Sequence, residues 1–431
     1  MKYLLPLGLA ATIASSALSQ GSLFPTKRLI GWADPVSTNL VSVLDLQEIP
    51  GCKPAKTYCK YRNNNPLKSS PWRYYAGGTA YDARNRSVWV SDGLILAENM
   101  VRGCKPRCRP IKALRLDKKA YVSGLAISQR KPRLFQLATY EYYFEVVTYD
   151  LQKCPRPISK CQYKFPTFGG LIRPVATGLA YDEVHDMLFI SISYRTASSS
   201  AWSHMGFAAK ASSPCKPICK FRLMPASRKL VTGLAWDNCE RALYATDGQI
   251  TQPHFFSKKD FCRPKYGRPC KKQTSPVWHG LCLVPGSRTL RKGKPCTKAP
   301  CNSCPSMYAS TYGGDPVFGN NNFGFSLTQA PSNSLGILLV RFGPLTSGIP
   351  FLCDRLYATT GPVLYIGSVP MGGAGSCGGN GSVPFPLPSS PSIAHAICGK
   401  PISSQWVVFC KSPIGAGLGG LSNAVQFTLS N

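Results

Sequence analysis

Aspartates recur at one position of a repeated sequence, and they are the first residues in this chain that could do chemistry. Asp82, Asp182 and Asp237 each end a short apolar stretch that begins at a glycine, and Ser128 holds this position in a fourth copy. Carboxylates that converge on a central channel could bind a divalent cation for a hydrolase. At such a position Asp or Ser can also cap a turn by accepting backbone hydrogen bonds. Because one copy has Ser, we expect turns here.

Two further aspartates, Asp92 and Asp247, each stand in a Ser/Thr-Asp-Gly sequence after a second apolar stretch. Glycine adopts positive φ at little cost, so this triplet is typical of a tight turn. These turns should lie at one rim of the domain, where a role in binding is an alternative. We expect turns here too.

Histidines and cysteines do not occur in a metal-binding spacing. The five histidines are His185, His204, His254, His279 and His395. Cys296, Cys301 and Cys304 resemble part of a zinc knuckle, but no fourth ligand follows at a suitable spacing, so disulfides are favoured. Nucleophile-elbow, Walker and dinucleotide-binding motifs are missing from the sequence. We therefore expect no catalytic residue, no metal and no cofactor.

Basic residues are the best functional lead, since 51 Lys and Arg stand against 19 Asp and Glu and the formal net charge is +32. A field of one sign attracts polyanions, although it can also serve solubility alone. Many of these cations flank cysteines at equivalent repeat positions, so they should form a belt around the outer edge of the domain. The candidates for polyanion binding are Lys53, Lys56, Lys60, Lys105, Arg107, Arg109, Lys216, Lys220, Arg222, Arg263, Lys265 and Arg268.

The N-terminus and the cysteine content both indicate secretion. Residues 1–19 have a basic Lys2, an apolar core and the small-x-small end Ala17-Leu18-Ser19, which is typical of a signal peptide. No later stretch is long enough for a membrane span. In an oxidising compartment most of the 19 cysteines should form disulfides, and the odd number leaves one over. We expect a secreted or cell-surface protein.

The expected disulfides follow the order of the cysteines along the chain. Close pairs should each staple a hairpin, and the pairings are Cys52 with Cys59, Cys104 with Cys108, Cys154 with Cys161, Cys215 with Cys219, Cys262 with Cys270, Cys353 with Cys377 and Cys398 with Cys410. Sequence alone does not prove such connectivity.

Glycines at 78, 124, 178 and 233 open four copies of one unit, at separations of 46, 54 and 55 residues. Each period contains about four short apolar stretches, the signature of a β-propeller with four-stranded blades. Gly280–Val284 could supply a fifth inner strand, and one blade would then combine strands from both ends of the domain. We expect an all-β protein with a propeller over residues 25–286, of about five blades, with four or six as alternatives.

The composition changes after the repeats. Residues 287–310 are rich in Lys, Pro and Cys and indicate a linker. Residues 311–431 contain short alternating or continuous apolar runs separated by Gly, Pro, Ser and Asn, and few charges. This pattern predicts a C-terminal antiparallel β-sandwich.

Two stretches resemble known families. The repeated glycine, apolar strand, Asp turn and second strand, as in G-L-A-Y-D-E-V-H-D-M-L-F-I-S from Gly178, is similar to the repeat of NHL and YncE-like propellers. The stretch Phe323–Pro344, with Gln405-Trp406-Val407 and Leu421-Ser422-Asn423-Ala424, resembles a C-terminal domain common in secreted planctomycete proteins. The first resemblance implies a fold, and neither implies an activity.

We therefore expect a secreted, non-catalytic binding or matrix protein whose basic propeller rim engages an anionic extracellular polymer. That polymer could be an acidic or sulfated polysaccharide, a cell surface or DNA. The alternatives are a propeller-type hydrolase or lactonase with its site in the central channel, and a purely structural assembly protein. The sequence does not indicate an oligomeric state.

Overall fold

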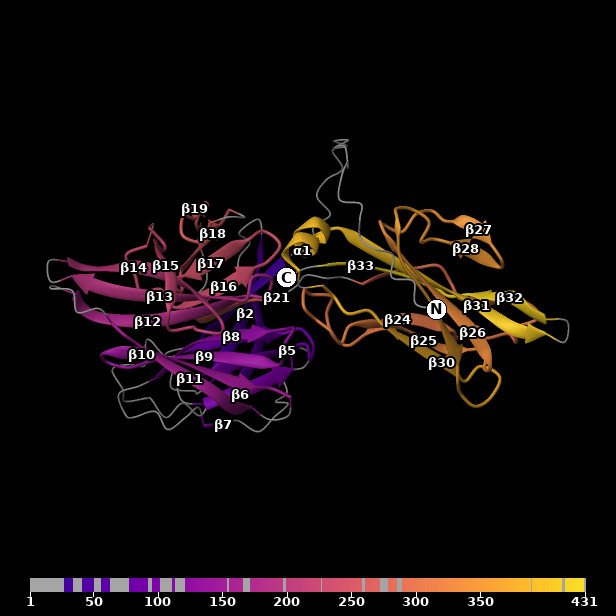
Figure 1. The fold of residues 1–431 in the computed structure, drawn as a ribbon, viewed down its shortest axis with the longest axis horizontal. Coiled ribbons are helices and arrows are strands. Elements are labelled where there is room, and N and C mark those ends of the chain that lie inside the picture. Colours follow the sequence, from indigo (N-terminus) through magenta and orange to yellow (C-terminus); the bar gives the residue numbers. More distant parts are fainter. Residues whose placement is uncertain are drawn as a thin grey trace.

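Five antiparallel sheets make up the N-terminal part of the chain (Figure 1). The computed structural model describes residues 27–33, 41–49, 56–62, 77–91, 95–100, 111–112, 121–152, 155–165, 171–196, 199–225, 227–257, 260–271, 278–284, 289–388, 390–412 and 415–429. The signal sequence expected at residues 1–19 lies outside these ranges. None of the described helical residues form a segment with the length and hydrophobicity of a membrane span.

Four of these sheets follow the chain order, with four strands along each path. They are β4 (Gly78–Asp82), β5 (Ser87–Ser91), β6 (Ile95–Met100) and β7 (Ile111–Lys112); β8 (Tyr121–Ser128), β9 (Arg133–Thr139), β10 (Tyr143–Asp150) and β11 (Arg156–Lys164); β12 (Leu171–Asp182), β13 (Met187–Thr196), β14 (Ser199–Lys210) and β15 (Pro217–Arg222); and β16 (Gly233–Asp237), β17 (Ala242–Thr246), β18 (Ile250–Phe255) and β19 (Lys265–Tyr266), with β20 (Cys270–Lys271) also on β18.

The fifth sheet joins the two ends of the repeat region. Its order is β21 (Trp278–Val284), β1 (Lys27–Ala33), β2 (Val41–Ile49) and β3 (Lys56–Arg62). Leu29 pairs with Leu283 and Trp32 with Gly280. The expected contribution of Gly280–Val284 to a sheet with N-terminal strands is confirmed.

The first strands of neighbouring sheets lie side by side, and the contacts return to their start. β4 contacts β8, β8 contacts β12, β12 contacts β16, β16 contacts β21, and β21 contacts β4. The repeat glycine permits this approach: a Cβ on Gly233 would lie 2.7 Å from the backbone nitrogen of Leu281, and one on Gly124 would lie 2.8 Å from that of Leu179. Any larger residue would push the strands apart.

The C-terminal part contains two sheets that share one apolar core. The larger has the order β22 (Leu290–Lys292), β33 (Ala424–Thr428), β31 (Pro401–Ser412), β26 (Ser334–Phe342), β29 (Val363–Met371), with β32 (Gly415–Leu421) between β31 and β23 (Cys296–Thr297). The smaller contains β24 (Tyr308–Tyr312), β25 (Gly324–Ala330) and β30 (Gly379–Pro384). A hairpin of β27 (Ile349–Phe351) and β28 (Asp354–Leu356) and the helix α1 (Pro391–Ile397) complete this part. Phe325, Trp406 and Phe427 are buried in the shared core.

Residues 287–310 were expected to form a linker outside any sheet, and this prediction is wrong for the parts of the segment that form strands. Leu290–Lys292 pairs with β33, and Cys296–Thr297 pairs with β32, so this segment supplies strands to the C-terminal sheet. Leu290, Arg291 and Lys292 are all exposed. Charged, exposed residues are typical of an edge strand, which is why the segment lacks the expected apolar alternation.

Disulfides connect sheets instead of stapling hairpins, so the expected pairings are wrong wherever the structure describes them. Among the described residues the bridges are Cys161–Cys215, Cys219–Cys262, Cys239–Cys398, Cys296–Cys353, Cys301–Cys410 and Cys304–Cys377. Cys270 is also disulfide-bonded, and not to Cys262. The predicted partners Cys52, Cys104, Cys108 and Cys154 lie outside the described residues, and the side chain of Cys59 is not described.

Chain geometry explains this correction. Cys219 lies on β15, whereas Cys215 lies in the turn before this strand. A disulfide needs Cα atoms less than about 7 Å apart. Cys161 meets Cys215 at a Cα distance of 5.9 Å because the neighbouring sheets bring β11 close to the turn before β15. The bridges Cys161–Cys215 and Cys219–Cys262 therefore tie the outer strands of successive sheets together.

The C-terminal part is fixed against the sheets at the turns that follow their first strands. The Cys239–Cys398 bridge crosses this contact. Asp315 accepts a hydrogen bond from the Tyr81 hydroxyl. It also forms an ion pair with Arg86 at 2.8 Å. Arg241 donates to Nε2 of both His185 and His395, at 3.0 and 3.2 Å. Figure 1 shows α1 at this junction of the two lobes.

Candidate functional site

The repeated aspartates cap turns, as the sequence predicts. Oδ1 of Asp182 accepts hydrogen bonds from the backbone N–H groups of Val184 and His185, at 2.9 and 3.2 Å. Asp237 accepts from two backbone groups in the same way, and Ser128 accepts from Lys131 at 3.1 Å. Asp82 accepts from the backbone and side chain of Arg84. The turn interpretation is confirmed at all four positions.

Asp247 also caps a turn, with Oδ1 accepting from Gln249 and Ile250 at 2.9 and 2.7 Å. Its second oxygen accepts a hydrogen bond of 2.5 Å from the Ser227 hydroxyl. Asp247 therefore caps its own turn and also holds the segment before β16 that contains Ser227. Asp92 lies outside the described residues.

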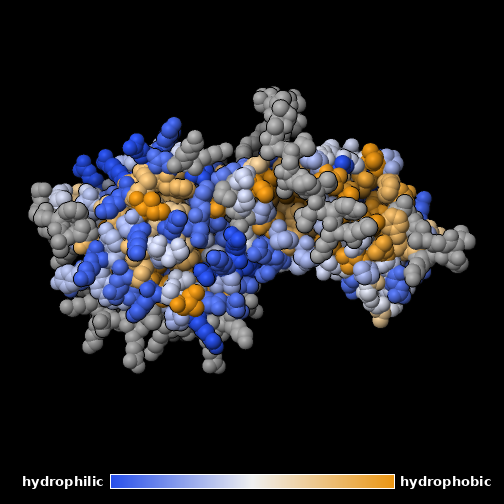
Figure 2. Space-filling view, in the orientation of Figure 1, coloured by the Kyte–Doolittle hydropathy of each residue, from blue (hydrophilic) through white to orange (hydrophobic). Residues whose placement is uncertain are grey.

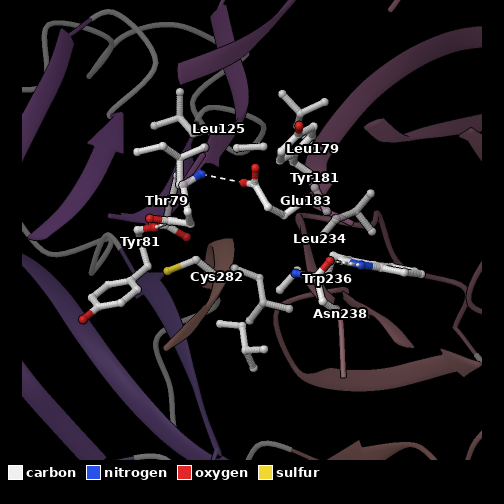
Figure 3. A pocket seen from close by; sticks show the side chains of 18 of the residues that line it. Thr79, Tyr81, Leu125, Leu179, Tyr181, Glu183, Leu234, Trp236, Asn238 and Cys282 are labelled. Atoms are coloured by element: carbon white, nitrogen blue, oxygen red, sulfur yellow. Dashed lines mark hydrogen bonds between the residues drawn. The ribbon is translucent and has the colours of Figure 1, made fainter. Parts of the chain in front are cut away.

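The residues directly after Ser128 and Asp182 have a role that sequence reasoning missed. Oε1 of Gln129 accepts from the backbone of Ala83, and Nε2 of Gln129 donates to the Tyr81 carbonyl, so Gln129 joins its sheet to the preceding one. Glu183 does the same one sheet further on, accepting from Ser128, Gln129 and Arg130. Figure 3 shows a hydrogen bond to the Glu183 carboxylate. The fixed place of these polar residues, one after the turn Asp or Ser, was the available signal.

Glu183 has an unusual protonation equilibrium. Its complete burial raises the pKa to about 7, although the two backbone N–H groups and the Ser128 hydroxyl lower it. A carboxyl that is half ionised near neutrality could act as a general acid or base. Its three donors come from one turn of the neighbouring sheet, however, and this indicates a structural connection.

The channel between the first strands of the sheets is narrow, and both polar side chains, among them Gln129 and Glu183, and apolar side chains line it. Its cavity of about 70 Å³ is lined by Leu125, Leu179, Leu234 and Leu281, and Phe318 from the C-terminal part also contributes (Figure 3). Ligand pockets usually measure about 300–1,000 Å³, so this space suits a few water molecules and no sugar-sized substrate. Among the described residues, no three His, Cys, Asp or Glu side chains form a group able to hold a metal ion.

The described members of the predicted polyanion set lie on the outermost strands and adjoining loops. Lys216, Lys220 and Arg222 are exposed at β15, and Arg263, Lys265 and Arg268 are exposed around β19. Lys56 and Lys60 lie on β3, but their side chains are not described. Lys53, Lys105, Arg107 and Arg109 lie outside the described residues. Figure 2 shows strongly hydrophilic side chains standing out from the lobe that carries β14, β15, β18 and β19.

A third outer strand adds cations that sequence reasoning did not select. Arg156, Lys160 and Lys164 on β11 are exposed, and they flank Cys161 as the selected residues flank other cysteines. That flanking position was the signal. We call the exposed cations on β11, at β15 and around β19 the basic edge. The bridges Cys161–Cys215 and Cys219–Cys262 connect its three parts covalently.

A groove of about 780 Å³ opens beside β15 within this basic edge. Its lining includes Tyr194, Trp202, His204, Lys220, Arg222 and Arg228. Burial lowers the pKa of His204 to about 4, with the nearby Asp247 opposing this effect, so the imidazole is neutral at physiological pH. Its Nδ1 lies 2.9 Å from the Ser193 hydroxyl.

Comparisons with known proteins show similarity to solved structures only. No family model matches the sequence, and no curated protein matches it either. The chain is similar to a structure of a nidogen/laminin complex (13% identity, 60% of this chain and 98% of that chain, TM-score 0.34). It is also similar to a periplasmic gluconolactonase from Pseudomonas aeruginosa (10% identity, 60% and 70%, TM-score 0.37) and to AztD from Citrobacter koseri (11% identity, 59% and 62%, TM-score 0.27). Scores this low carry no argument about function, and the resemblance to NHL and YncE-like repeats and to the planctomycete domain stays a prediction.

Proposed function

We propose that this protein is a secreted, non-catalytic binding protein in which a closed five-bladed β-propeller presents the basic edge to an anionic extracellular polysaccharide. The C-terminal sheets form a β-sandwich that is fixed against one face of the propeller. The circuit of contacts among β4, β8, β12, β16 and β21 supports the closure. Six disulfides among the described residues indicate an oxidising compartment.

The observation that carries the proposal is the recurrence of exposed cations on three successive outer strands. Lys160, Lys220 and Lys265 represent β11, β15 and β19, and the bridges between these strands limit how far the charges can move apart. A prearranged line of cations gains affinity for a polyanion because fewer side chains and segments must be ordered on binding. The channel, with a cavity of only about 70 Å³, offers less to the hydrolase alternative than the basic edge offers to binding.

Heparin chromatography tests this proposal. We expect the wild-type protein to remain bound at about 0.15 M salt and to elute at a higher concentration, because binding through many charges weakens steeply with salt. A variant with Arg263, Lys265 and Arg268 changed to Gln should elute earlier. The matched control changes Arg291, Lys292 and Lys294 to Gln in the C-terminal part, and should elute with the wild type. Elution of the wild type below physiological salt, or equal shifts in both variants, would contradict the proposal.

A further inference from the structure

The groove beside β15 combines cations with aromatic rings and hydroxyls in one lining. Tyr194 and Trp202 are half-buried and line it together with Ser199 and Ser203. No Asp or Glu belongs to the lining. An aromatic face packs against the C–H surface of a pyranose ring, and hydroxyls and cations bind its polar groups; a groove of this composition therefore suits an acidic sugar.

The backbone fixes the walls of the groove. Met205 on β14 pairs with Arg222 on β15, and Leu223 donates to the carbonyl of His204 at 3.1 Å. The loop after β15 is attached to the opposite wall, where the backbone of Trp202 donates to the Arg228 carbonyl at 3.1 Å. Arg222 and Arg228 are both exposed, and their main chains are held on either side of the space. The site is therefore formed before any ligand binds.

Cations lie over the Trp202 ring, which lines the groove, and over the ring of Phe207, which is buried on β14. The Arg195 guanidinium lies 4.5 Å from the centre of the Trp202 ring, and the Lys220 ammonium lies 5.4 Å from that of Phe207. Such cation–π contacts restrict the indole and the lysine to defined positions. Asp247 is buried and accepts a hydrogen bond from Ser227, which lines the groove, whereas Lys220, Arg222 and Arg228 of the lining are exposed.

We propose that this groove is a specific binding site for a short stretch of acidic polysaccharide. A sugar ring would pack on Trp202, and Arg222 and Arg228 would bind its anionic group. This proposal rests on the proposed function and specifies its ligand. Arg presents paired N–H donors that fit either a carboxylate or a sulfate. The volume of about 780 Å³ accommodates a few sugar units, whereas a DNA duplex needs an open surface.

The test measures the affinity of four variants for defined oligosaccharides at about 0.15 M salt. The probes are a heparin hexasaccharide, an oligogalacturonate that carries carboxylates alone, and a dextran sulfate oligomer that carries sulfates alone. R222Q/R228Q removes two charges in the groove, K160Q/K164Q removes two charges on β11 as a matched control, and W202A removes the ring without a change in charge. Thermal unfolding checks each fold, and W202F is the conservative replacement.

We expect R222Q/R228Q to weaken hexasaccharide binding by about tenfold or more, as for anchoring residues at the centre of an interface. K160Q/K164Q should weaken it about threefold at most, as for exposed charges. W202A should lose about fivefold or more with an unchanged salt dependence, and W202F should restore most of the affinity. The preferred single-anion probe identifies carboxylate or sulfate as the recognised group.

Two results would overturn the groove while leaving the proposed function intact. In the first, both charge-removing variants weaken binding equally and W202A matches the wild type, so binding is diffuse. In the second, single-stranded oligothymidylate displaces the hexasaccharide and loses affinity in W202A, so the groove binds nucleic acid. A wild-type protein that binds none of the sugar probes would instead refute the proposed function itself.

Discussion

The bridge between Cys161 and Cys215 allows the sharpest test of the structural reasoning. Changing both cysteines to Ser removes a link that closes a separation of 54 residues between neighbouring sheets. For a loop of that length the chain-entropy relation gives about 4 kcal/mol of stabilisation at 25 °C. The hairpin staple predicted from sequence, Cys154 with Cys161, would close only seven residues and contribute about 2.4 kcal/mol. In the connectivity predicted from sequence the same variant would break Cys154–Cys161 and Cys215–Cys219 together, so peptide mapping separates the two connectivities. Loss of the bridge should appear as a difference in unfolding free energy between the wild type and the variant.

Denaturant unfolding under non-reducing conditions measures this difference. We expect the double variant to lose about 3–4 kcal/mol, somewhat below the full value because the Cys219–Cys262 bridge already restricts part of the unfolded chain. The control is C282S, since Cys282 has a free, buried thiol and its replacement removes no bridge. A loss below about 1 kcal/mol in the double variant would refute the reasoning, because a link between sheets cannot cost so little in the entropy account. So would recovery of a Cys154–Cys161 peptide from the wild type.

Three further predictions follow from the bridges, the strand contacts and a buried imidazole. Both described bridges of the basic edge join the second cysteine of one repeat to the first of the next, so we expect non-reducing peptide mapping to join Cys270 to Cys52; a peptide that links Cys270 to any other cysteine would exclude this rule. Gly233→Ala should lower the free energy of unfolding by about 1–3 kcal/mol or more, because the Cβ of the new Ala would lie 2.7 Å from the backbone nitrogen of Leu281, which cannot move alone. Thermal or denaturant unfolding measures this loss, and an unchanged stability would contradict the close strand contact. His254 is fully buried and its pKa is lowered to about 4, so between about pH 6.5 and 4 the unfolded state binds more protons than the folded state, and the protein becomes less stable as the pH is lowered. When the pH is lowered from 7 to 5, the free energy of unfolding of H254Q should fall by about 2 kcal/mol less than that of the wild type. An equal pH dependence of the two proteins would refute this.

Local features of the fold could be predicted from the sequence because they depend on neighbouring residues. The turn capped by Asp182 depends only on the three residues that follow it. The same sequence pattern recurs at Asp237 and Ser128, which strengthens the prediction. The closing strand at Gly280 was also predictable, since its glycine continues the period of the repeat. Where the signal lies within a few residues or recurs at a fixed period, one sequence suffices.

Long-range partners could not be predicted in this way. Cys239 meets Cys398 across 159 residues, and nothing in the spacing of either cysteine indicates the other. The groove is a similar case: Trp202 lies on β14 and Arg228 on the loop after β15, and the pairing of β14 with β15 brings them to one space. The basic edge was predictable as a group of residues because its charges recur. Its subdivision into a groove and a plain surface depends on packing.

The bridges and the charge of the basic edge are connected physically. A net charge of +32 destabilises the compact state through self-repulsion, and exposed cations on β11, β15 and β19 concentrate that repulsion at the outer strands. Outer strands of this kind would separate most easily, because each has a neighbour within its sheet on one side only. The bridges at Cys161–Cys215 and Cys219–Cys262 stand where this separation would begin, and they limit it without neutralising any charge. Ion pairs could also stabilise these strands, but they would use up the cations that a polyanion needs. Under the proposed function, a covalent connection would limit this separation and still leave the cations available to a polyanion.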